Sequence, residues 1–219
     1  MSKKVEMKTR ILKTNEDWAG RNREVLAGKG VKALNLMSSP GSGKTTILER
    51  TVESLRDEIR LGVIEGDLQT ELDAERIRRL GIPVYQIETG GGCHLDAEMV
   101  ARAMEQLPLE EIDLLFIENV GNLVCPAEFD LGEDLKVMVA SVTEGHDKPA
   151  KYPLMFREAS VILVNKMDLV SATDFDMEAF ARDVAKINPK AEVFWVSAKT
   201  GAGFEEWCEW LKGYVKGKP

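Results

Sequence analysis

A glycine-rich loop at residues 38–45 has the residue types and spacing of a phosphate-binding site. It reads Ser38-Ser-Pro-Gly-Ser-Gly-Lys-Thr45 and matches G-x-x-x-x-G-K-[ST] except at the first position, which is serine. Glycines let backbone N–H groups close around phosphate oxygens, while the lysine reaches the terminal phosphates and the threonine hydroxyl suits Mg²⁺. A plain glycine-rich turn between a strand and a helix is the alternative. The predicted nucleotide-binding residues of this loop are Gly41, Ser42, Gly43, Lys44, Thr45 and Thr46.

Acidic residues after two apolar segments could complete a magnesium site. Glu118-Asn-Val-Gly121 ends one segment, where a carboxylate would hold the water shell of Mg²⁺ and a glycine N–H would sense the terminal phosphate. The segment 65–73, Glu-Gly-Asp-Leu-Gln-Thr-Glu-Leu-Asp, follows the other, and its first aspartate could instead cap the next helix. The magnesium candidates are Thr45, Asp67 and Glu118. The catalytic candidates are Lys44, Asp67 and Asp73, either aspartate being able to ligate Mg²⁺ or orient the attacking water.

A polar quartet, Asn165-Lys-Met-Asp168, follows an apolar segment and is suited to reading guanine. A carboxylate at Asp168 would accept hydrogen bonds from guanine N1–H and its 2-amino group, a donor pair that adenine lacks. Ser197-Ala-Lys199 follows the next apolar segment and would complete the pocket through a backbone N–H. This order of motifs resembles the GTPase superfamily. The predicted base-binding residues are Asn165, Lys166, Asp168, Ser197, Ala198 and Lys199.

Two further loops contain possible metal ligands. Cys93 and His94 end the segment Gly-Gly-Gly-Cys-His, and Cys125 precedes Pro126. Cysteine and histidine together suit Zn²⁺ or Ni²⁺, and three ligands leave a coordination position open, which suits metal transfer. Small loop residues beside a solvated histidine are the alternative. We interpret Cys208 as a core residue of an amphipathic helix, and His146 as solvated.

The elements that must position these residues follow from the apolar pattern. Continuous apolar runs predict strands, and they alternate with helical segments, the first of which is predicted at residues 15–30. This pattern predicts an α/β, three-layer P-loop NTPase fold, with a mostly parallel sheet covered by helices on both faces. We expect a single GTPase domain, with residues 1–31 as an N-terminal helical extension and 32–219 as the P-loop G domain. Each motif then lies at the carboxyl end of a strand, where loops share one rim.

Composition narrows the class of partner and compartment. The chain has 219 residues, 30% of them charged, and a formal net charge of −8. Such acidity disfavours nucleic acid and anionic membrane surfaces as partners. No apolar stretch reaches the roughly 20 residues that span a bilayer, and the basic start lacks the apolar region of a secretory signal. With three cysteines, an odd number, we expect no disulfide framework and a cytoplasmic location.

Beyond the general GTPase motifs, the sequence closely resembles the family of hydrogenase nickel-incorporation GTPases known as HypB, over nearly its whole length. The matching stretches are Ser38–Thr45, Glu65–Thr70, Asp73–Arg76, Gly92–Leu95, Ile117–Pro126, Ser141–Gly145, Asp147–Pro149, Lys151–Pro153 and Asn165–Asp168. The Cys-His and Asn-Leu-Val-Cys-Pro pieces distinguish this family from its urease-maturing relative.

The resemblance implies a GTPase with Mg²⁺ and GTP/GDP as cofactors that assists nickel insertion into [NiFe]-hydrogenase. It also implies a homodimer in the GTP-bound state, with Cys93, His94 and Cys125 binding Zn²⁺ or Ni²⁺ at the interface. The implied partners are a second nickel-carrying maturation protein and the hydrogenase large-subunit precursor. The first cysteine is Cys93, so we expect no N-terminal nickel motif of the kind that some members carry.

Three other interpretations compete with this one. The chain could be a urease-type nickel accessory GTPase. It could be a metal-binding scaffold in which GTP only sets the dimer state. It could be a small-molecule kinase of the same P-loop branch, although Asp168 and the segment 197–199 favour guanine over the ATP that such kinases mostly use.

Overall fold

The structure is a computed structural model that describes residues 3–67 and 72–217, with side chains described from residue 12 onward and outside 67–73. In this part of the chain seven parallel strands form one sheet, in the order β3-β2-β4-β1-β5-β6-β7. The strands are β1 (Lys32–Ser38), β2 (Leu61–Asp67), β3 (Val84–Glu88), β4 (Leu114–Glu118), β5 (Leu135–Ser141), β6 (Val161–Asn165) and β7 (Glu192–Trp195).

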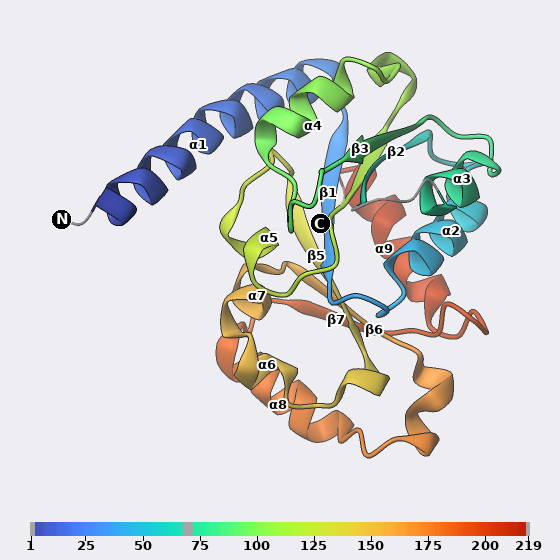
Figure 1. Ribbon diagram of the computed structural model, residues 1–219. Helices are drawn as coiled ribbons and strands as arrows, with labels where there is room; N and C mark the ends of the chain where they lie inside the picture. Colours follow the sequence, from blue (N-terminus) through green and yellow to red (C-terminus); the bar gives the residue numbers. More distant parts are fainter. Residues whose placement is uncertain (1–2, 68–71, 218–219) are drawn as a thin grey trace.

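Helices connect the strands and cover both faces of the sheet (Figure 1). The α-helices are α1 (Lys3–Lys29), α2 (Lys44–Leu55), α3 (Leu72–Arg78), α4 (Ala97–Met104), α5 (Cys125–Glu128), α6 (Lys148–Lys151), α7 (Pro153–Glu158), α8 (Met177–Ile187) and α9 (Phe204–Val215). Short 3-10 helices are η1 (Leu109–Glu111), η2 (Val142–Glu144) and η3 (Met167–Ala172). The predicted fold class, an α/β three-layer fold, is therefore confirmed, and every strand pairing is parallel.

Strand β1 lies at the centre of the sheet, and its alternating side chains explain the two faces. Leu34 and Leu36 belong to one core cluster with side chains of α2, α3 and α9. Ala33 packs in a second cluster with α1 and α4, and Met37 in a third with α7 and α8. Successive strand residues point to opposite faces, so a buried central strand needs apolar residues at nearly every position.

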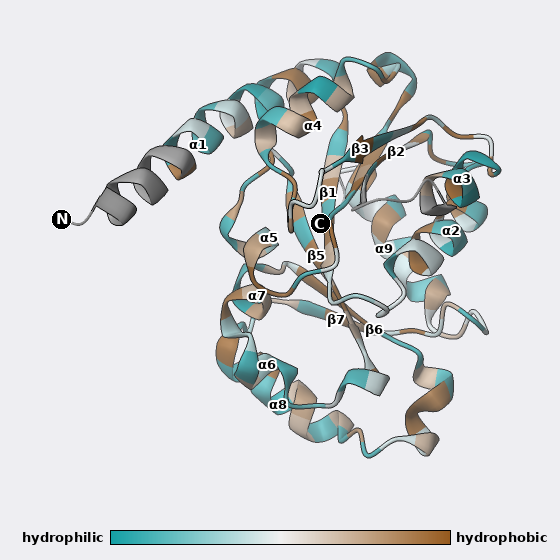
Figure 2. Ribbon diagram, viewed as in Figure 1, coloured by the Kyte–Doolittle hydropathy of each residue, from teal (hydrophilic) through white to brown (hydrophobic). Residues whose placement is uncertain are grey.

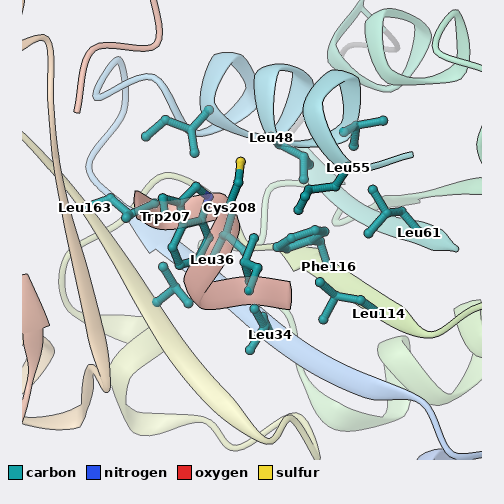
Figure 3. Packing of buried hydrophobic residues seen from close by; sticks show 14 of the residues in the cluster. Leu34, Leu36, Leu48, Leu55, Leu61, Leu114, Phe116, Leu163, Trp207 and Cys208 are labelled. Atoms are coloured by element: carbon teal, nitrogen blue, oxygen red, sulfur yellow. The ribbon is translucent and has the colours of Figure 1, made fainter. Parts of the chain in front are cut away.

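Figure 3 shows the first cluster at close range, with Trp207 and Cys208 of α9 beside Leu34 and Leu36. Trp207 is fully buried, and its indole Nε1 donates to the Thr51 hydroxyl at 3.0 Å. A buried indole N–H without such a partner would be costly, so this bond fixes α9 against α2. Cys208 is a buried core residue, as predicted.

Helix α1 is longer than the sequence pattern predicted, since it begins at Lys3 rather than near residue 15. Residues 3–14 are mostly polar and provide little amphipathic signal, whereas the later turns pack on α4. Asn22 fixes this contact by donating from Nδ2 to the Ala97 and Leu131 carbonyls, at 2.8 Å each. Hydrophilic and hydrophobic residues both occur along α1 and α4 (Figure 2), as expected of helices with one face on a core.

In the described part of the chain, no helix combines the length and apolar character needed to cross a membrane.

Candidate functional site

The glycine-rich loop joins the end of β1 to the start of α2 at Lys44. Gly41 and Gly43 have φ values of 75° and 97°, which glycine adopts without the steric penalty of a side chain. A Cβ on Gly43 would lie 2.5 Å from Asn165 Nδ2, so glycine is needed there for space as well. Lys44 Nζ donates to Ser38 Oγ at 2.9 Å, which holds the ammonium over its own loop.

A cavity of about 490 Å³ opens between this loop and the ends of β2 and β4. Its lining combines most of the predicted phosphate-loop residues with residues from the end of β2 and from the segment 118–121. The lining residues are Pro40, Gly41, Gly43, Lys44, Thr45, Thr46, Glu65, Gly66, Arg76, Glu118, Asn119, Val120, Gly121 and Lys166. Backbone N–H groups at the start of α2 and a lysine at one wall make the cavity suitable for polyphosphate.

Two buried carboxyl groups line the cavity at the ends of β2 and β4. Thr45 Oγ1 donates to Glu118 Oε1 at 2.7 Å. Glu65 is the register partner of Glu118 across β2 and β4, and both side chains are buried. Glu65 was not among the predicted site residues, although a charged residue within an apolar strand was the available signal. The hydroxyl and carboxylate oxygens here are of the type that Mg²⁺ prefers.

The two candidate aspartates can be placed only by their backbones. Asp67 is the last residue of β2, and Asp73 is the second residue of α3. Their side chains lie outside the described residues, so their predicted roles in catalysis and magnesium binding stay predictions.

Arg76 of α3 also lines the cavity, a position that the motifs did not predict. Its Nε donates to Glu49 Oε1 at 2.9 Å, and a second guanidinium nitrogen lies 3.3 Å from Thr46 Oγ1. The pairing with Glu49 on α2 holds this positive charge beside the phosphate cavity. A helical arginine shortly after the acidic segment 65–73 was the available signal in the sequence.

The predicted guanine pocket is already connected to the phosphate loop. Asn165 Nδ2 donates to the Ser42 carbonyl at 2.9 Å, and the Ala198 N–H donates to Asn165 Oδ1 at 3.0 Å. Lys166, at a φ of 63°, donates from Nζ to the Gly41 carbonyl at 2.7 Å. One asparagine and one lysine therefore join three loops that are distant in the sequence.

The predicted base-reading carboxylate, that of Asp168, lies at the exposed side of this junction. Ser197 Oγ donates to Asp168 Oδ1 at 2.6 Å, which orients the carboxylate, and Asp168 is exposed. Arg50 of α2 supports the neighbouring loop by donating to the Ala198 and Lys199 carbonyls, at 2.6 and 3.2 Å. Arg50 was not predicted, because its contact is to backbone atoms and leaves no motif.

The possible metal ligands form a cluster on a neighbouring part of the same rim. Candidate ligand atoms of Cys93, His94 and Cys125 all lie within 4.8 Å of one another. The two sulfur atoms are 3.1 Å apart, and Cys93 Sγ lies 3.5 Å from His94 Nδ1. The structure therefore brings together the three residues that the sequence assigned to metal, which come from the loop after β3 and the loop after β4.

The surroundings of these residues fix their positions and shift the pKa values of two of them. His94 packs against Phe129 with ring centroids 4.0 Å apart, and burial lowers its pKa, which favours the neutral imidazole that binds metal. The hydrogen-bonded contact between the Cys125 and Cys93 thiols, together with burial, raises the pKa of Cys125. Asn122 Oδ1 accepts from the Val124 N–H at 2.8 Å and so shapes the turn before Cys125. His146 is not near this cluster; its Nδ1 accepts from the Asp176 N–H at 3.3 Å.

A short loop joins the phosphate cavity to the metal-ligand cluster. Gly121 lines the cavity, and a Cβ on it would lie 3.0 Å from Pro40 Cα, so the two backbones are in close contact. Cys125 follows four residues later and begins α5. A shift of Gly121 would therefore be transmitted along a very short segment.

Comparisons with known proteins agree with this geometry. Residues 32–195 match the family described as CobW/HypB/UreG, nucleotide-binding domain. The hydrogenase maturation factor HypB of Escherichia coli strain K12 is 51% identical over 208 residues, covering 95% of this chain and 72% of the relative.

Two solved structures are similar over almost the whole chain. The structure of the hydrogenase maturation factor HypB from Archaeoglobus fulgidus has a TM-score of 0.88 at 45% identity, covering 93% of this chain and 100% of the other. HypB from Helicobacter pylori, solved in complex with nickel, has a TM-score of 0.89 at 40% identity, covering 93% and 95%. The phosphate loop, the guanine-type pocket and these similarities lead to one conclusion: the chain belongs to the HypB family of hydrogenase maturation factors, P-loop proteins of the CobW/HypB/UreG group.

Proposed function

We propose that this chain is a GTP-hydrolysing metallochaperone that assists nickel insertion into [NiFe]-hydrogenase. The observation that carries the proposal is the single loop in which Gly121 lines the phosphate cavity and Cys125 contributes a thiol to the metal-ligand cluster. A residue that would sense the terminal phosphate and a ligand for the cargo metal thus belong to one segment. This arrangement suits a protein that binds and releases a metal according to its nucleotide state.

In this proposal GTP occupies the cavity and the guanine pocket together. Lys44 exchanges its hydroxyl partner Ser38 for phosphate oxygens and stabilises the charge that develops on the transferring phosphoryl group. Magnesium supplies further charge stabilisation when bound, and the oxygens of Thr45 and Glu118 are the described groups that fit it. Either Asp67 or Asp73 orients the attacking water. We expect slow turnover, because the guanidinium group of Arg76 is paired with Glu49 and so would not stabilise charge on the transferring phosphoryl group.

The cargo site is proposed to be completed by a second copy of the chain. Three ligands from one copy leave a coordination position open, and Cys93 is exposed, so a partner could approach it. A two-fold dimer in the GTP state would place two such clusters together. The nickel reported for the Helicobacter pylori relative supports nickel as cargo, and Zn²⁺ suits the same sulfur and nitrogen ligands.

The proposed partners follow from the family. They are a second nickel-carrying maturation protein, which would exchange metal with the cluster, and the hydrogenase large-subunit precursor. The cytoplasm, where thiols stay reduced, suits a site built from free cysteines. We further propose that residues 1–219 act as one GTPase domain, in which residues 1–31 form a helical extension of the G domain. Similarity to HypB relatives over most of the chain favours this function over a urease-type accessory role.

Metal affinity measured in two nucleotide states tests the proposal. Ni²⁺ and Zn²⁺ binding would be titrated with GDP and with a non-hydrolysable GTP analogue, using the native protein and Cys125→Ala. Cys208→Ala is the matched control, because Cys208 is a buried core thiol away from the cluster. We expect the native affinity to differ between nucleotides for at least one metal, and Cys125→Ala to bind weakly in both states.

Three outcomes of this titration would contradict the proposal. Equal native affinities in both nucleotide states would mean that metal binding does not depend on the bound nucleotide. Unchanged binding in Cys125→Ala would mean that the ligands lie elsewhere. A loss of binding in Cys208→Ala that matched the loss in Cys125→Ala would mean that the effect is structural and does not identify Cys125 as a ligand.

A further inference from the structure

A buried amide side chain links the phosphate cavity to the metal-ligand loop. Asn119 follows Glu118 at the end of β4, lines the cavity, and is only 1% exposed. Its Oδ1 accepts from the Leu95 N–H at 3.1 Å and from the Val120 N–H at 3.0 Å. Leu95 is the residue directly after His94. One side chain therefore contacts both the segment that would sense phosphate and the segment that carries two possible ligands.

Leu95 has a second contact with the cavity wall. Its side chain is fully buried and packs so closely on Gly66 of β2 that a Cβ there would lie 2.8 Å from Leu95 Cγ. Gly66 lines the cavity beside Glu65. Leu95 thus lies between one segment that follows β4 and one that ends β2, and both are segments expected to respond to the terminal phosphate. Such tight packing transmits small shifts, because protein interiors hold few voids to absorb them.

The amide nitrogen of Asn119 is held by a second hydrogen bond, to a side chain of the central strand β1. Asn119 Nδ2 donates to Asn35 Oδ1 at 3.2 Å, and Asn35 Nδ2 donates in turn to Glu133 Oε1 at 3.2 Å. Asn35 lies on β1, which leads directly into the phosphate loop. This chain of buried polar groups interrupts an otherwise apolar face of the sheet. Because the amide oxygen and the amide nitrogen of Asn119 both have hydrogen-bond partners, its side chain has one defined orientation.

We propose that Asn119 is the positioning residue that couples the nucleotide state to the metal-ligand loop, by holding the Leu95 N–H and with it the neighbouring His94. The inference rests on the proposed function and deepens it, since it names a route separate from the loop between Gly121 and Cys125. Movement of the segment after Glu118 weakens or breaks the buried hydrogen bond to the Leu95 N–H, because the acceptor Asn119 belongs to that segment. His94, the residue before Leu95, then changes position relative to Cys125.

The test compares how strongly nucleotide changes metal affinity in three proteins. Ni²⁺ affinity would be measured with GDP and with a non-hydrolysable GTP analogue in the native protein, Asn119→Ala and Asn22→Ala. Asn22 is a matched control, because it is equally buried and bonds to Ala97 O just beyond the metal loop, yet it is not part of the cavity wall. Thermal unfolding of each variant would verify that it is folded.

Coupling energies between linked sites commonly correspond to roughly 5- to 150-fold changes in affinity, and we expect the native ratio within this range. In Asn119→Ala the ratio should fall at least about threefold below the native ratio, because only the loop between Gly121 and Cys125 remains to couple the two sites, whereas Asn22→Ala should keep the native ratio. A native ratio retained in Asn119→Ala would overturn the inference and leave the proposed function intact. A native ratio of unity would overturn both, and equal losses in the two variants would indicate a general structural effect and overturn the inference.

Hydrogen exchange at Leu95 gives a measurement that needs no variant. The Leu95 N–H should exchange slowly in one nucleotide state and measurably faster in the other, because its acceptor belongs to the moving segment. Backbone N–H groups around Ala97, whose carbonyl accepts from Asn22, should exchange at similar rates in both nucleotide states. Equal exchange of the Leu95 N–H with GDP and with the GTP analogue would refute the role of Asn119, even if Asn119→Ala fails to fold.

Discussion

Replacing Asp168 with asparagine isolates the base-reading step. Ser197 Oγ holds Asp168 Oδ1 at 2.6 Å, at the open side of the junction between the phosphate loop and the loop of Ala198. A carboxylate there accepts from guanine N1–H and from the 2-amino group. In Asp168→Asn one acceptor becomes an NH₂ group, which faces the guanine amino group as a second donor. The variant therefore loses one charged hydrogen bond and weakens the other without changing side-chain size.

The size of the loss follows from these contacts. A hydrogen bond to a charged group contributes about 1.5–3 kcal/mol net, and a neutral one about 0.5–1.5 kcal/mol. Losing one charged bond and neutralising the other should cost about 2–4 kcal/mol, which corresponds to roughly 30- to 700-fold in affinity. Xanthine has a carbonyl oxygen where guanine has its amino group. The new NH₂ group can donate to it, so affinity for xanthosine diphosphate should rise.

Equilibrium binding of GDP and xanthosine diphosphate to native protein and Asp168→Asn would measure this exchange. Asp174→Asn is the control, since it removes the same charge from an exposed position a few residues along the chain. The reasoning would be refuted if Asp168→Asn bound GDP as tightly as Asp174→Asn, or if xanthosine diphosphate gained nothing.

Three further predictions concern the phosphate loop and its neighbours. Lys44→Ala should lower GTP turnover by about 10²–10³-fold in a phosphate-release assay, as for loss of one transition-state donor, and native turnover would contradict the assignment. Gly43→Ala places a side chain on a residue with a φ of 97° and brings its Cβ into contact with Asn165, so GDP affinity should fall about tenfold or more. Gly20→Ala is the control and should bind GDP normally, because a Cβ there meets nothing within 4 Å. Burial raises the pKa of Glu144, so the native state holds this proton more tightly than the unfolded chain does. The contribution of Glu144 to the free energy of unfolding therefore falls as pH rises above 4.5. Glu144→Gln should flatten that fall when urea unfolding is compared at pH 5 and pH 7, and an unchanged fall would contradict this.

The sequence predicted much of the site because each motif follows a strand. In a parallel sheet the carboxyl ends of the strands share one edge, so Asn165 and Lys166 could be expected to meet the phosphate loop, as they do through Ser42 and Gly41. The same argument brought Cys93 and Cys125 together from separate loops. Spacing alone could not have established this contact, because neither loop matches the usual ligand spacing of a structural zinc site.

Other features depend on packing that no local pattern records. Glu65 faces the cavity because β2 pairs with β4 in a particular register, and Arg76 lies there because Glu49 on α2 holds it. Asn119 was part of a quoted motif, yet its link to Leu95 is a contact between two loops. Short helices such as α5 and α7 were missed as well, because four- and six-residue helices that begin with proline near the first turn leave no periodic signal.

The central claim is that nucleotide and metal act on one coupled system, through loops that meet at the rim of the sheet. The most direct test is to measure dimer fraction and bound nickel per protomer together, by sedimentation and metal analysis, with GDP and with a non-hydrolysable GTP analogue. The account predicts mostly monomers with GDP, mostly dimers with the analogue, and a different nickel content in the two states that is lost in Cys125→Ala. The same dimer fraction and the same nickel content with both nucleotides would contradict it.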